Sequence, residues 1–408
     1  MERYSEYKDS GAQWLGKIPK HWDVIKAKYL WNEVFSFSEN GSENLLSVSQ
    51  YDGVTQAKNE SRSESLKGYK KVVKNNLVIN IMLAWMGGLG VSEYNGIVSP
   101  AYCVYRLKKA ANPQFMHYLY KTPMYLAEFA RHSTGVIPSR WRMYTDDFGQ
   151  VLTLIPPIDE QDKIVSYLDK VTSKIDEAIA QQQKMIDLLN ERKQIIINNA
   201  VTKGLNPDAP MKYSGVDWIG EIPEHWELKQ YRHLFHNLDY LRKPITADLR
   251  SRNNPLYDYY GASGIIDKID HFNIEDKVLL IAEDGANLLL RNLPLIYKAE
   301  GRFWVNNHAH ILKPIKDDYD FLAYVMESTD YTLYITGSAQ PKLSQANLNA
   351  VKLPIPPLYE QLKIVEHIKA KTEGIDFSIY NAKRMLTLLQ ERKQIIINDV
   401  VTGKVKVS

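Results

Sequence analysis

Apolar residues recur at alternating steps of four and three along two long stretches of the chain. This spacing predicts two amphipathic helices, each with a seam that packs against another helix. The first seam is expected at Ile164, Leu168, Val171, Ile175, Ala178, Met185, Leu189 and Ile196, with polar Gln182 and Arg192 at two further positions. The second is expected at Ile364, Ile368, Ile375, Ala382, Met385, Leu389 and Ile396, with Lys371 and Ser378 as polar interruptions.

Both predicted helices have start and stop signals. A Pro-Pro pair precedes each one, at 156–157 and 356–357, and acidic residues at 159, 160 and 162 complement the dipole of the first helix. Gly204 and Gly403 follow the periodic residues and favour helix termination. Residues 159–203 contain no Gly or Pro, so the first helix should extend roughly 65 Å at ~1.5 Å per residue. The second contains Gly374, which costs about 1 kcal/mol relative to Ala.

The segments outside these helices have the pattern of mixed α/β domains. Alternating or β-branched runs predict strands at 45–49, 77–82 and 102–107, and again at 278–282 and 310–312. Helical spacing is present at 113–131 and 321–334. Gly87, Gly88 and Gly90 interrupt the chain between two of the strands.

The chain contains an internal repeat. Ile155–Gln161 (IPPIDEQ) recurs as Ile355–Gln361 (IPPLYEQ), and the eight residues Glu191–Asn198 recur unchanged as Glu391–Asn398, both at an offset of 200. A second block, Ser10–Trp22, returns as Ser214–Trp226 at an offset of 204. We call these repeated blocks and the long helices the frame, and residues 23–154 and 227–354 the inserts. The inserts share almost no side-by-side identity, which favours functional divergence over uniform drift.

The repeat predicts an α+β fold with four parts. These are residues 1–155, a central helical spacer at 156–206, residues 207–355, and a C-terminal helical spacer at 356–408. The simplest way to bury both seams is to pack the helices on each other as an antiparallel coiled coil, with a pseudo-two-fold axis. Because the block at 214–226 follows the first helix, the second helix should end near the block at 10–22. The chain is therefore expected to be quasi-circular, with Ser408 near the N-terminal segment.

Composition sets only broad limits. The chain has 408 residues, of which 44% are apolar, a formal net charge of +3 and a single cysteine, Cys103. It has no run of eighteen apolar residues and no secretory signal, so we expect a cytoplasmic protein. One cysteine makes neither an internal disulfide nor a thiolate metal site. The small positive charge permits a nucleic-acid partner without requiring one.

Loops in the inserts carry side chains suited to nucleic acid. Arg140, Trp141 and Arg142 follow a Gly/Pro turn at 135–138, and Arg and Trp suit phosphate contact, stacking or bidentate guanine contact. The second insert has a parallel loop at 336–342. The candidate DNA contacts are Arg140, Trp141, Arg142, Lys70, Lys71, Lys342, Tyr260, Arg242, Lys243 and Arg291. For each of them the alternative is a solvated surface charge or an aromatic residue of the core.

Motifs for catalysis are weak or absent. No Walker A pattern occurs, and Gly261–Gly264 lacks the Gly-x-Ser-x-Gly spacing of a nucleophile elbow. Residues 254–257 (NPLY) are similar to the NPPY motif of adenine methyltransferases, but no Gly-rich cofactor loop precedes them, which favours a chance turn. His308 and His310 have no further metal-type ligand near in sequence, which favours a packed or surface pair. We therefore expect no catalytic residue and no metal site in this chain.

The frame motifs resemble those of a known family. The Trp-x-Gly-x-Ile-Pro-x-His-Trp pattern at 14–22 and 218–226 is similar to that of type I restriction–modification specificity subunits, apart from residue types at its variable positions. So are the Pro-Pro-x-x-Glu-Gln opening of each helix and the Glu-Arg-Lys-Gln run near each helix end. The departures are small: Tyr359 stands where the first copy has Asp159, and Gly374 where it has Lys174.

The resemblance implies a non-catalytic, DNA-binding subunit of a restriction system. Each insert would be a target recognition domain for one half of a bipartite site in double-stranded DNA, and the helices would set the spacing and dock two modification (methyltransferase) subunits. The modification subunits would carry S-adenosylmethionine and methylate adenine N6, and separate restriction subunits would use ATP and Mg²⁺ to translocate and cleave DNA. Candidate docking residues off the main seam are Ile179, Ile186, Ile195 and Ile197, for which an inner-core role is the alternative.

Two other classes of function remain open from the sequence. A self-contained methyltransferase would bind its cofactor as an isolated chain, and the missing Gly-rich loop argues against it. A coiled-coil scaffold whose inserts bind proteins would show no salt-dependent affinity for DNA.

Overall fold

The computed structural model describes residues 2–51, 53–57, 66–137, 140–246, 250, 256–337 and 339–407. The chain forms two compact units, unit 1 at Met1–Gln183 with Arg384–Ser408, and unit 2 at Lys184–Lys383. Each unit combines one insert with part of both long helices. The units therefore cut across the boundaries expected from the sequence, which treated the helices as separate spacers.

Unit 1 contains the first insert and most of the short frame strands that hold it. Its helical elements are α1 (Ala27–Leu30), η1 (Ala84–Met86), α2 (Pro113–Tyr120), α3 (Pro123–Arg131) and α4 (Thr145–Gln150), followed by the long α5 (Ile158–Lys203), which continues into unit 2 after Gln183. Its strands are β1 (Tyr7–Asp9), β2 (Lys17–Pro19), β3 (Asp23–Lys26), β4 (Trp31–Glu33), β5 (Leu46–Ser49), β6 (Gly53–Gln56), β7 (Lys70–Val72), β8 (Leu77–Asn80), β9 (Leu89–Val91), β10 (Gly96–Val98), β11 (Tyr102–Leu107) and β12 (Leu152–Ile155).

Unit 2 repeats the plan with a different insert. Its helical elements are η3 (Tyr231–His233), η4 (Asp239–Leu241), α6 (Asn287–Leu290), α7 (Tyr319–Ser328), η6 (Thr332–Tyr334), α8 (Gln345–Ala350) and the long α9 (Leu358–Val401). Its strands are β13 (Met211–Tyr213), β14 (Glu221–Pro223), β15 (Glu227–Gln230), β16 (Phe235–Asn237), β17 (Tyr257–Gly261), β18 (Gly264–Ile269), β19 (Ile274–Ala282), β20 (Ile296–Val305), β21 (Ala309–Pro314) and β22 (Lys352–Ile355).

A two-stranded antiparallel ribbon closes each insert at its base. In unit 1, β3 pairs with β12, with Asp23 opposite Ile155. In unit 2, β15 pairs with β22, with Glu227 opposite Ile355. The chain thus enters and leaves each insert at one place, directly before a long helix.

The interiors of the two inserts differ. The first holds a four-stranded sheet in the order β4-β11-β8-β9, and the second a six-stranded sheet in the order β16-β21-β19-β20-β17-β18. The strands expected near 45–49, 77–82 and 102–107 are confirmed, as are those near 278–282 and 310–312, whereas β17, β18 and β20 were not predicted. The helix expected at 113–131 is two helices, because Thr122 caps α3 and Pro123 occupies its first turn.

Each unit has a core that joins its insert to both long helices. In unit 1, Ile164 and Leu168 of α5 and Val400 and Val401 of α9 are buried with residues of the first insert. In unit 2, Val201 of α5 and Ile364 of α9 pack with residues of the second insert in the same way. This shared packing explains why the compact units do not follow the boundaries of the helices.

The two long helices pack together, with antiparallel segments in each unit. Lys393 of α9 pairs with Asp176 of α5 at 2.7 Å in unit 1, and Lys193 of α5 pairs with Asp376 of α9 at 2.6 Å in unit 2. The two pairs involve the same frame positions at the offset of 200. Within the described residues, no helix is both long enough and apolar enough to cross a lipid bilayer.

The inner face of α5 follows the period of an ordinary α-helix. Its least exposed positions include 164, 168, 172, 175, 179, 182, 186, 189, 193, 197 and 200. These positions are separated by ten steps that span 36 residues, so the average spacing is 3.6 residues. The strict heptad expected from the sequence drifts away from this face by about 20° per heptad. The predicted seam residue Met185 is therefore exposed, and Ile186 is buried in its place.

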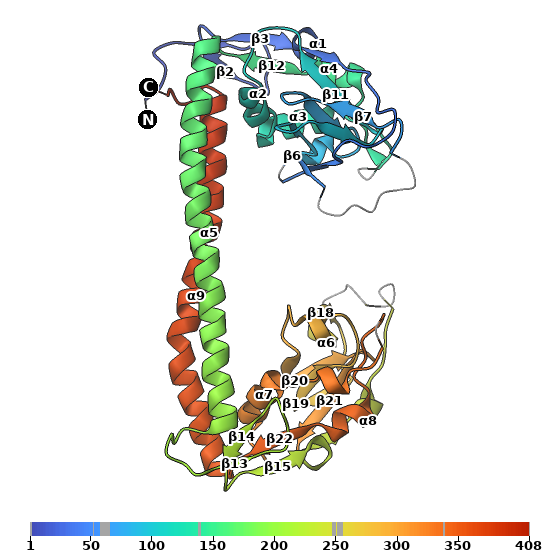
Figure 1. Cartoon of the computed structure of the whole chain (residues 1–408), viewed down its shortest axis with the longest axis vertical. Coiled ribbons are helices and arrows are strands. Elements are labelled where there is room, and N and C mark those ends of the chain that lie inside the picture. The colour runs from blue at the N-terminus through green and yellow to red at the C-terminus, as the bar shows by residue number, and fades with distance from the viewer. Residues whose placement is uncertain are drawn as a thin grey trace. The chain divides into compact units, whose positions relative to one another are not determined.

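The ends of the chain lie beside each other in unit 1 (Figure 1). Glu2 forms an antiparallel bridge with Lys406, and the Tyr7 hydroxyl donates to the Gly403 carbonyl at 3.2 Å. Gly403 has a φ of 73° and packs so closely on Pro19 and Trp22 that a Cβ would lie 2.4 Å from the proline ring. The expectation that the C-terminal segment returns to the first frame block is confirmed by these contacts.

Candidate functional site

Two loops meet at one end of the central sheet in unit 1. The first follows β8 and contains η1, and the second is a hairpin closed by mutual backbone hydrogen bonds of 3.0 and 2.9 Å between Thr134 and Arg142. The Met143 N–H donates to the Ile81 carbonyl at 2.9 Å and fastens the hairpin to the first loop. The predicted loop residues 140–142 therefore lie on a fixed structure.

Aromatic and cationic side chains gather on these loops. The rings of Trp85 and Trp141 meet edge to face with centroids 5.4 Å apart, and Arg142 Nη2 lies 3.9 Å from the Met82 sulfur. Arg140 is exposed on the same hairpin. The structure thus brings together the predicted residues Arg140, Trp141 and Arg142, and adds Trp85 and Met82, which the sequence analysis did not identify.

Unit 2 builds the same pair of loops from other residues. A hairpin is closed by backbone bonds between Thr336 and Lys342, at 2.9 and 2.8 Å, and the Leu343 N–H donates to the Glu283 carbonyl at 2.7 Å. Glu283 directly follows β19 as Ile81 follows β8, and Leu343 stands 200 residues after Met143. The two inserts therefore share a local backbone arrangement despite their unlike sequences.

Charged side chains occupy the loops of unit 2. Glu283 forms ion pairs with Arg242 and, at 3.1 Å, with Lys342. Burial would raise the pKa of the Glu283 carboxyl, but hydrogen bonds from Arg242 and Lys342 outweigh burial and lower it. The carboxylate is therefore ionised at neutral pH and holds the hairpin to the strand end.

A buried carboxylate and a buried imidazole lie under these loops. His310 Nδ1 lies 2.6 Å from Asp239 Oδ2, and its Nε2 lies 2.8 Å from the Leu343 carbonyl oxygen. Burial opposes ionisation of Asp239, but the hydrogen bond and charge of His310 lower its pKa overall. This network ties β21 to the hairpin that precedes α8.

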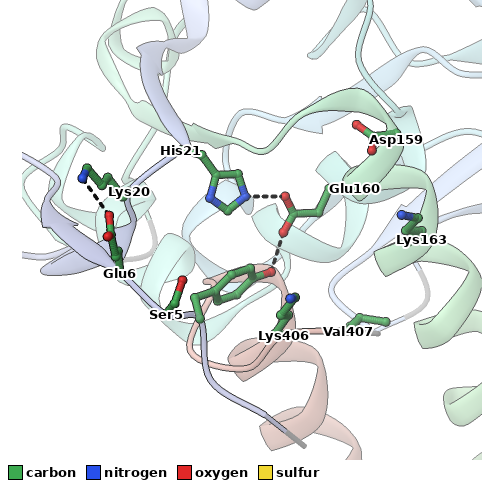
Figure 2. Close-up of a pocket in the computed structure, with 10 residues that line it drawn as sticks. Ser5, Glu6, Lys20, His21, Asp159, Glu160, Lys163, Lys406 and Val407 are labelled. Carbon is green, nitrogen blue, oxygen red and sulfur yellow. Dashed lines mark hydrogen bonds and ion pairs between the residues drawn. The ribbon is translucent and has the colours of Figure 1, made fainter.

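The repeated frame motifs form a clamp at the start of α5 (Figure 2). Glu160 accepts a hydrogen bond from the Tyr4 hydroxyl at 2.5 Å and from the Trp22 indole at 3.2 Å, and lies 2.7 Å from His21 Nε2. Burial and the bond to Glu160 raise the pKa of Tyr4 well above its ordinary value, so its hydroxyl stays a donor. The His-Trp and Glu motifs are thus two parts of one contact.

Unit 2 has a reduced version of this clamp. Glu360 lies 2.8 Å from His225 Nε2, and position 208, which is equivalent to Tyr4, is aspartate. The buried indole nitrogen of Trp226 has no hydrogen-bond partner among the described residues. The clamp is therefore stronger in unit 1.

The glutamine after each clamp residue connects the helix to its insert. Gln161 accepts from the Asn112 N–H at 2.9 Å, and Gln361 accepts from the Asp318 N–H at 2.8 Å. Asn112 caps α2 and Asp318 caps α7 through their own side chains. The Glu-Gln pair thus fixes both the frame motif and the insert to the long helix.

Part of the chain matches a known protein family. Residues 223–378 match the family described as "Type I restriction modification DNA specificity domain". This segment of the chain is similar to the DNA specificity domain of that family. It includes the second insert, its clamp and the first half of α9.

Curated relatives match part or most of the chain. A type I restriction enzyme specificity subunit of Haemophilus influenzae is 36% identical over 132 residues, which is 32% of this chain and 33% of that protein. The MjaVIII specificity subunit of Methanocaldococcus jannaschii is 24% identical over 385 residues, with 83% of each chain covered. These matches support the interpretation of the chain as a type I specificity subunit.

A solved structure shows the same fold. A chain from a study of complex assembly and conformational transition of the type I restriction–modification system has a TM-score of 0.67 at 13% identity. The match covers 95% of this chain and 99% of that chain. The expected α+β class with two mixed domains and two long helices is confirmed.

Two of the residues predicted to contact DNA lie inside the folded inserts. Lys70 is buried beside Glu33, at 3.7 Å, because β7 lies within the folded insert. Tyr260 is buried against Phe303 in the core of the six-stranded sheet. As surface contacts, these two predictions are wrong.

Two predicted arginines have structural partners. Arg242 pairs with Glu283 and, at 3.5 Å, with Asp239, and Arg291 donates to the Thr329 carbonyl at 2.8 Å from a left-handed position after α6. Arg242 thus holds the loop after β16 to the end of β19, and Arg291 holds the residue after α6 to the end of α7. Lys342 and Lys243 are exposed and Lys71 is half-buried; Lys71 and Lys342 have carboxylate partners, Glu43 and Glu283.

The candidate docking isoleucines lie on different faces of α5. Ile186 and Ile197 are buried, because they belong to the inner face, and the docking prediction is wrong for both. Ile179 is half-buried. Ile195 is 54% exposed, and so is its repeat counterpart Ile395 at 59%, which the sequence analysis did not name.

The structure also places the histidines that were considered as metal ligands. His308 pairs with Asp284 at 2.9 Å while His310 pairs with Asp239, so the two imidazoles have separate partners. Within the described residues, no three His, Cys, Asp or Glu side chains gather as metal ligands. Asn254 and Pro255 of the NPLY segment lie outside the described residues.

Proposed function

We propose that this chain recognises a bipartite sequence in double-stranded DNA, with each insert reading one half. One observation carries the proposal. The two inserts present the same pair of loops on the same backbone attachment, Met143 to Ile81 and Leu343 to Glu283, with unlike side chains. A common scaffold with different reading groups is what two unlike half-sites require.

The long helices would set the distance between the half-sites and dock two modification subunits. Exposed apolar residues at matching positions of the two copies, such as Ile195 and Ile395, support two equivalent docking places. The partners of the complex would perform the chemistry. We expect S-adenosylmethionine and adenine-N6 methylation in the modification subunits, and ATP, Mg²⁺ and cleavage in the restriction subunits, with this chain non-catalytic.

Methylome sequencing tests the proposed function directly. We expect cells that carry this gene and active modification genes to contain a bipartite methyladenine motif that disappears when the gene is deleted. Restoring the gene should restore the same motif. An unchanged methylome after deletion would contradict the proposal.

The spacing role has its own experiment. Four residues inserted after residue 183, with four more after residue 383, lengthen both helices by about 6 Å at ~1.5 Å per residue. Both insertions are needed because the pairs Lys193–Asp376 and Lys393–Asp176 fix the register of the helices. With about 3.4 Å per base pair, the gap in the methylated motif should grow by about two base pairs, and both half-sites should persist.

A further inference from the structure

The loop that follows β8 and the hairpin closed by Thr134 and Arg142, which we call the paired loops of unit 1, present exposed apolar side chains. Met82, Leu83 and Met86 project from the loop that follows β8, and Val136 and Ile137 from the hairpin, and all five are exposed. We call these five residues the apolar loop surface. Val136 is 96% exposed, so its exposure costs free energy in water that a binding partner can recover.

The apolar loop surface is held in place by specific contacts. The Trp85 indole donates to the Met82 carbonyl at 3.2 Å, and its ring packs on Trp141 of the hairpin. Lys121 Nζ donates to the Gly87 carbonyl at 2.9 Å and closes the other end of the loop. A surface fixed in this way loses little conformational entropy when it binds.

Cationic groups adjoin this surface. Arg142 reaches the Met82 sulfur, and Arg140 stands two residues before it on the hairpin. Neither arginine has an ion-pair partner among the described residues. Apolar side chains beside unpaired guanidinium groups fit the major groove of DNA, where thymine exposes its 5-methyl group and guanine and phosphate attract arginine.

We propose that the apolar loop surface recognises thymine through its 5-methyl group in the half-site read by the first insert. This inference rests on the proposed function and assigns a chemistry to one of its two reading domains. Met82 and Val136 contact the methyl groups, and Arg140 and Arg142 hold the adjacent phosphate or guanine.

Deoxyuridine substitution tests the methyl contact, because uracil pairs like thymine and lacks only the methyl group. The full-length chain is titrated with a duplex that carries the motif found by methylome sequencing, with thymine or with deoxyuridine in the half-site of the first insert. We expect affinity to fall about fourfold for each contacted methyl group, from the burial free energy of one methyl. A duplex with a scrambled motif is the reference for specific binding.

Two variants connect the effect to the surface. Val136→Ser and Met82→Gln should bind the thymine duplex more weakly, and the difference between thymine and deoxyuridine should shrink or vanish. Val73→Ser is the matched control, because Val73 is also exposed in unit 1 but follows β7 and not the paired loops. Val73→Ser should keep the full difference.

The results that would contradict this inference differ from those that would contradict the proposed function. Equal binding of the thymine and deoxyuridine duplexes, or a full methyl effect in both Val136→Ser and Met82→Gln, would overturn the inference and leave the proposed function intact. No preference for the motif over the scrambled duplex would overturn both.

Discussion

Glu160 holds side chains from three positions of the N-terminal segment. Its carboxylate contacts Tyr4, His21 and Trp22 across a separation of more than 130 residues in sequence. Hydrogen bonds to a charged group contribute about 1.5–3 kcal/mol, and a buried donor left without a partner costs about 1–3 kcal/mol. We therefore expect Glu160→Ala to destabilise unit 1 by about 2–4 kcal/mol and to expose the N-terminal segment.

The second copy provides the control for this prediction. Glu360 contacts His225, and the indole of Trp226 has no partner to lose. Glu360→Ala should therefore be milder. Hydrogen exchange measured by mass spectrometry would compare peptides from residues 2–26 and 206–230 in the two variants, and equal loss of protection would show that the clamps are equivalent.

Arg140 and Arg142 of the unit 1 hairpin have no ion-pair partner in the part of the chain that the structure describes, and their contribution to DNA binding has a measurable signature. Each cation that neutralises a phosphate contributes about one to the slope of log affinity against log salt. We expect Arg140→Ala and Arg142→Ala each to weaken binding, with a slope smaller by about one for a phosphate contact. An arginine that reads guanine would instead relax specificity at one base pair.

A control arginine in the same insert is Arg106. It lies on β11 next to Tyr105, whose partner Leu77 begins β8, whereas the paired loops follow the other end of β8. Arg106→Ala should leave both affinity and salt slope unchanged. If all three variants behave alike, the hairpin has no special role.

At the scale of elements, the sequence predicted the frame well because its signals are local. The Pro-Pro pairs, Gly204 and Gly403 place the ends of α5 and α9 to within a few residues. The prediction of the inner face of α5 was less accurate. A heptad repeat and the 3.6-residue helical period both select Ile164 and Leu168, but the heptad also selects Met185, which is exposed.

The candidate site depended on tertiary contacts that the sequence does not contain. Lys70 is buried because Glu33 approaches it from β4, and Tyr260 is buried because β17 lies between β18 and β20, strands that were not predicted. The clamp, in contrast, could have been predicted from the sequence. The His-Trp pair and the Glu of the Pro-Pro motif are kept together in both copies, 139 residues apart in the first and 135 in the second.

The faces of α5 lead to a prediction about docking. Ile186 is 4% exposed, so Ile186→Ala should cost about 2–4 kcal/mol of stability. Ile195→Ala and Ile395→Ala should change stability by no more than about 0.5 kcal/mol, but each should weaken binding of one modification subunit. Urea denaturation and mass photometry of the purified complex would measure the two effects.

Exposed Leu333 lies on η6, outside both long helices, and provides the control for docking. Leu333→Ala should change neither stability nor assembly. A complete complex formed by the Ile195→Ala, Ile395→Ala double variant would remove these residues from the docking surface.

At the scale of the whole molecule, the two copies of the frame carry inserts that differ in sequence and in structure. Two contacts at the base of each insert are made in the same way in both units: the ribbon β3–β12 or β15–β22, and the bond from the backbone N–H of a helix N-cap residue to the glutamine of the long helix. The backbone groups that take part are the same in both units. An insert should therefore be exchangeable between the two positions.

This exchangeability can be tested within the chain itself. A variant in which residues 23–154 replace residues 227–354 keeps Gln361, which would then accept from the N–H of the grafted Asn112 instead of that of Asp318. Both residues cap the helix that follows them, so the graft preserves the junction. We expect the variant to fold and to direct methylation to a motif that contains the first half-site twice. The reciprocal graft should double the second half-site, and retention of the replaced half-site in either methylome would show that recognition is not confined to the inserts.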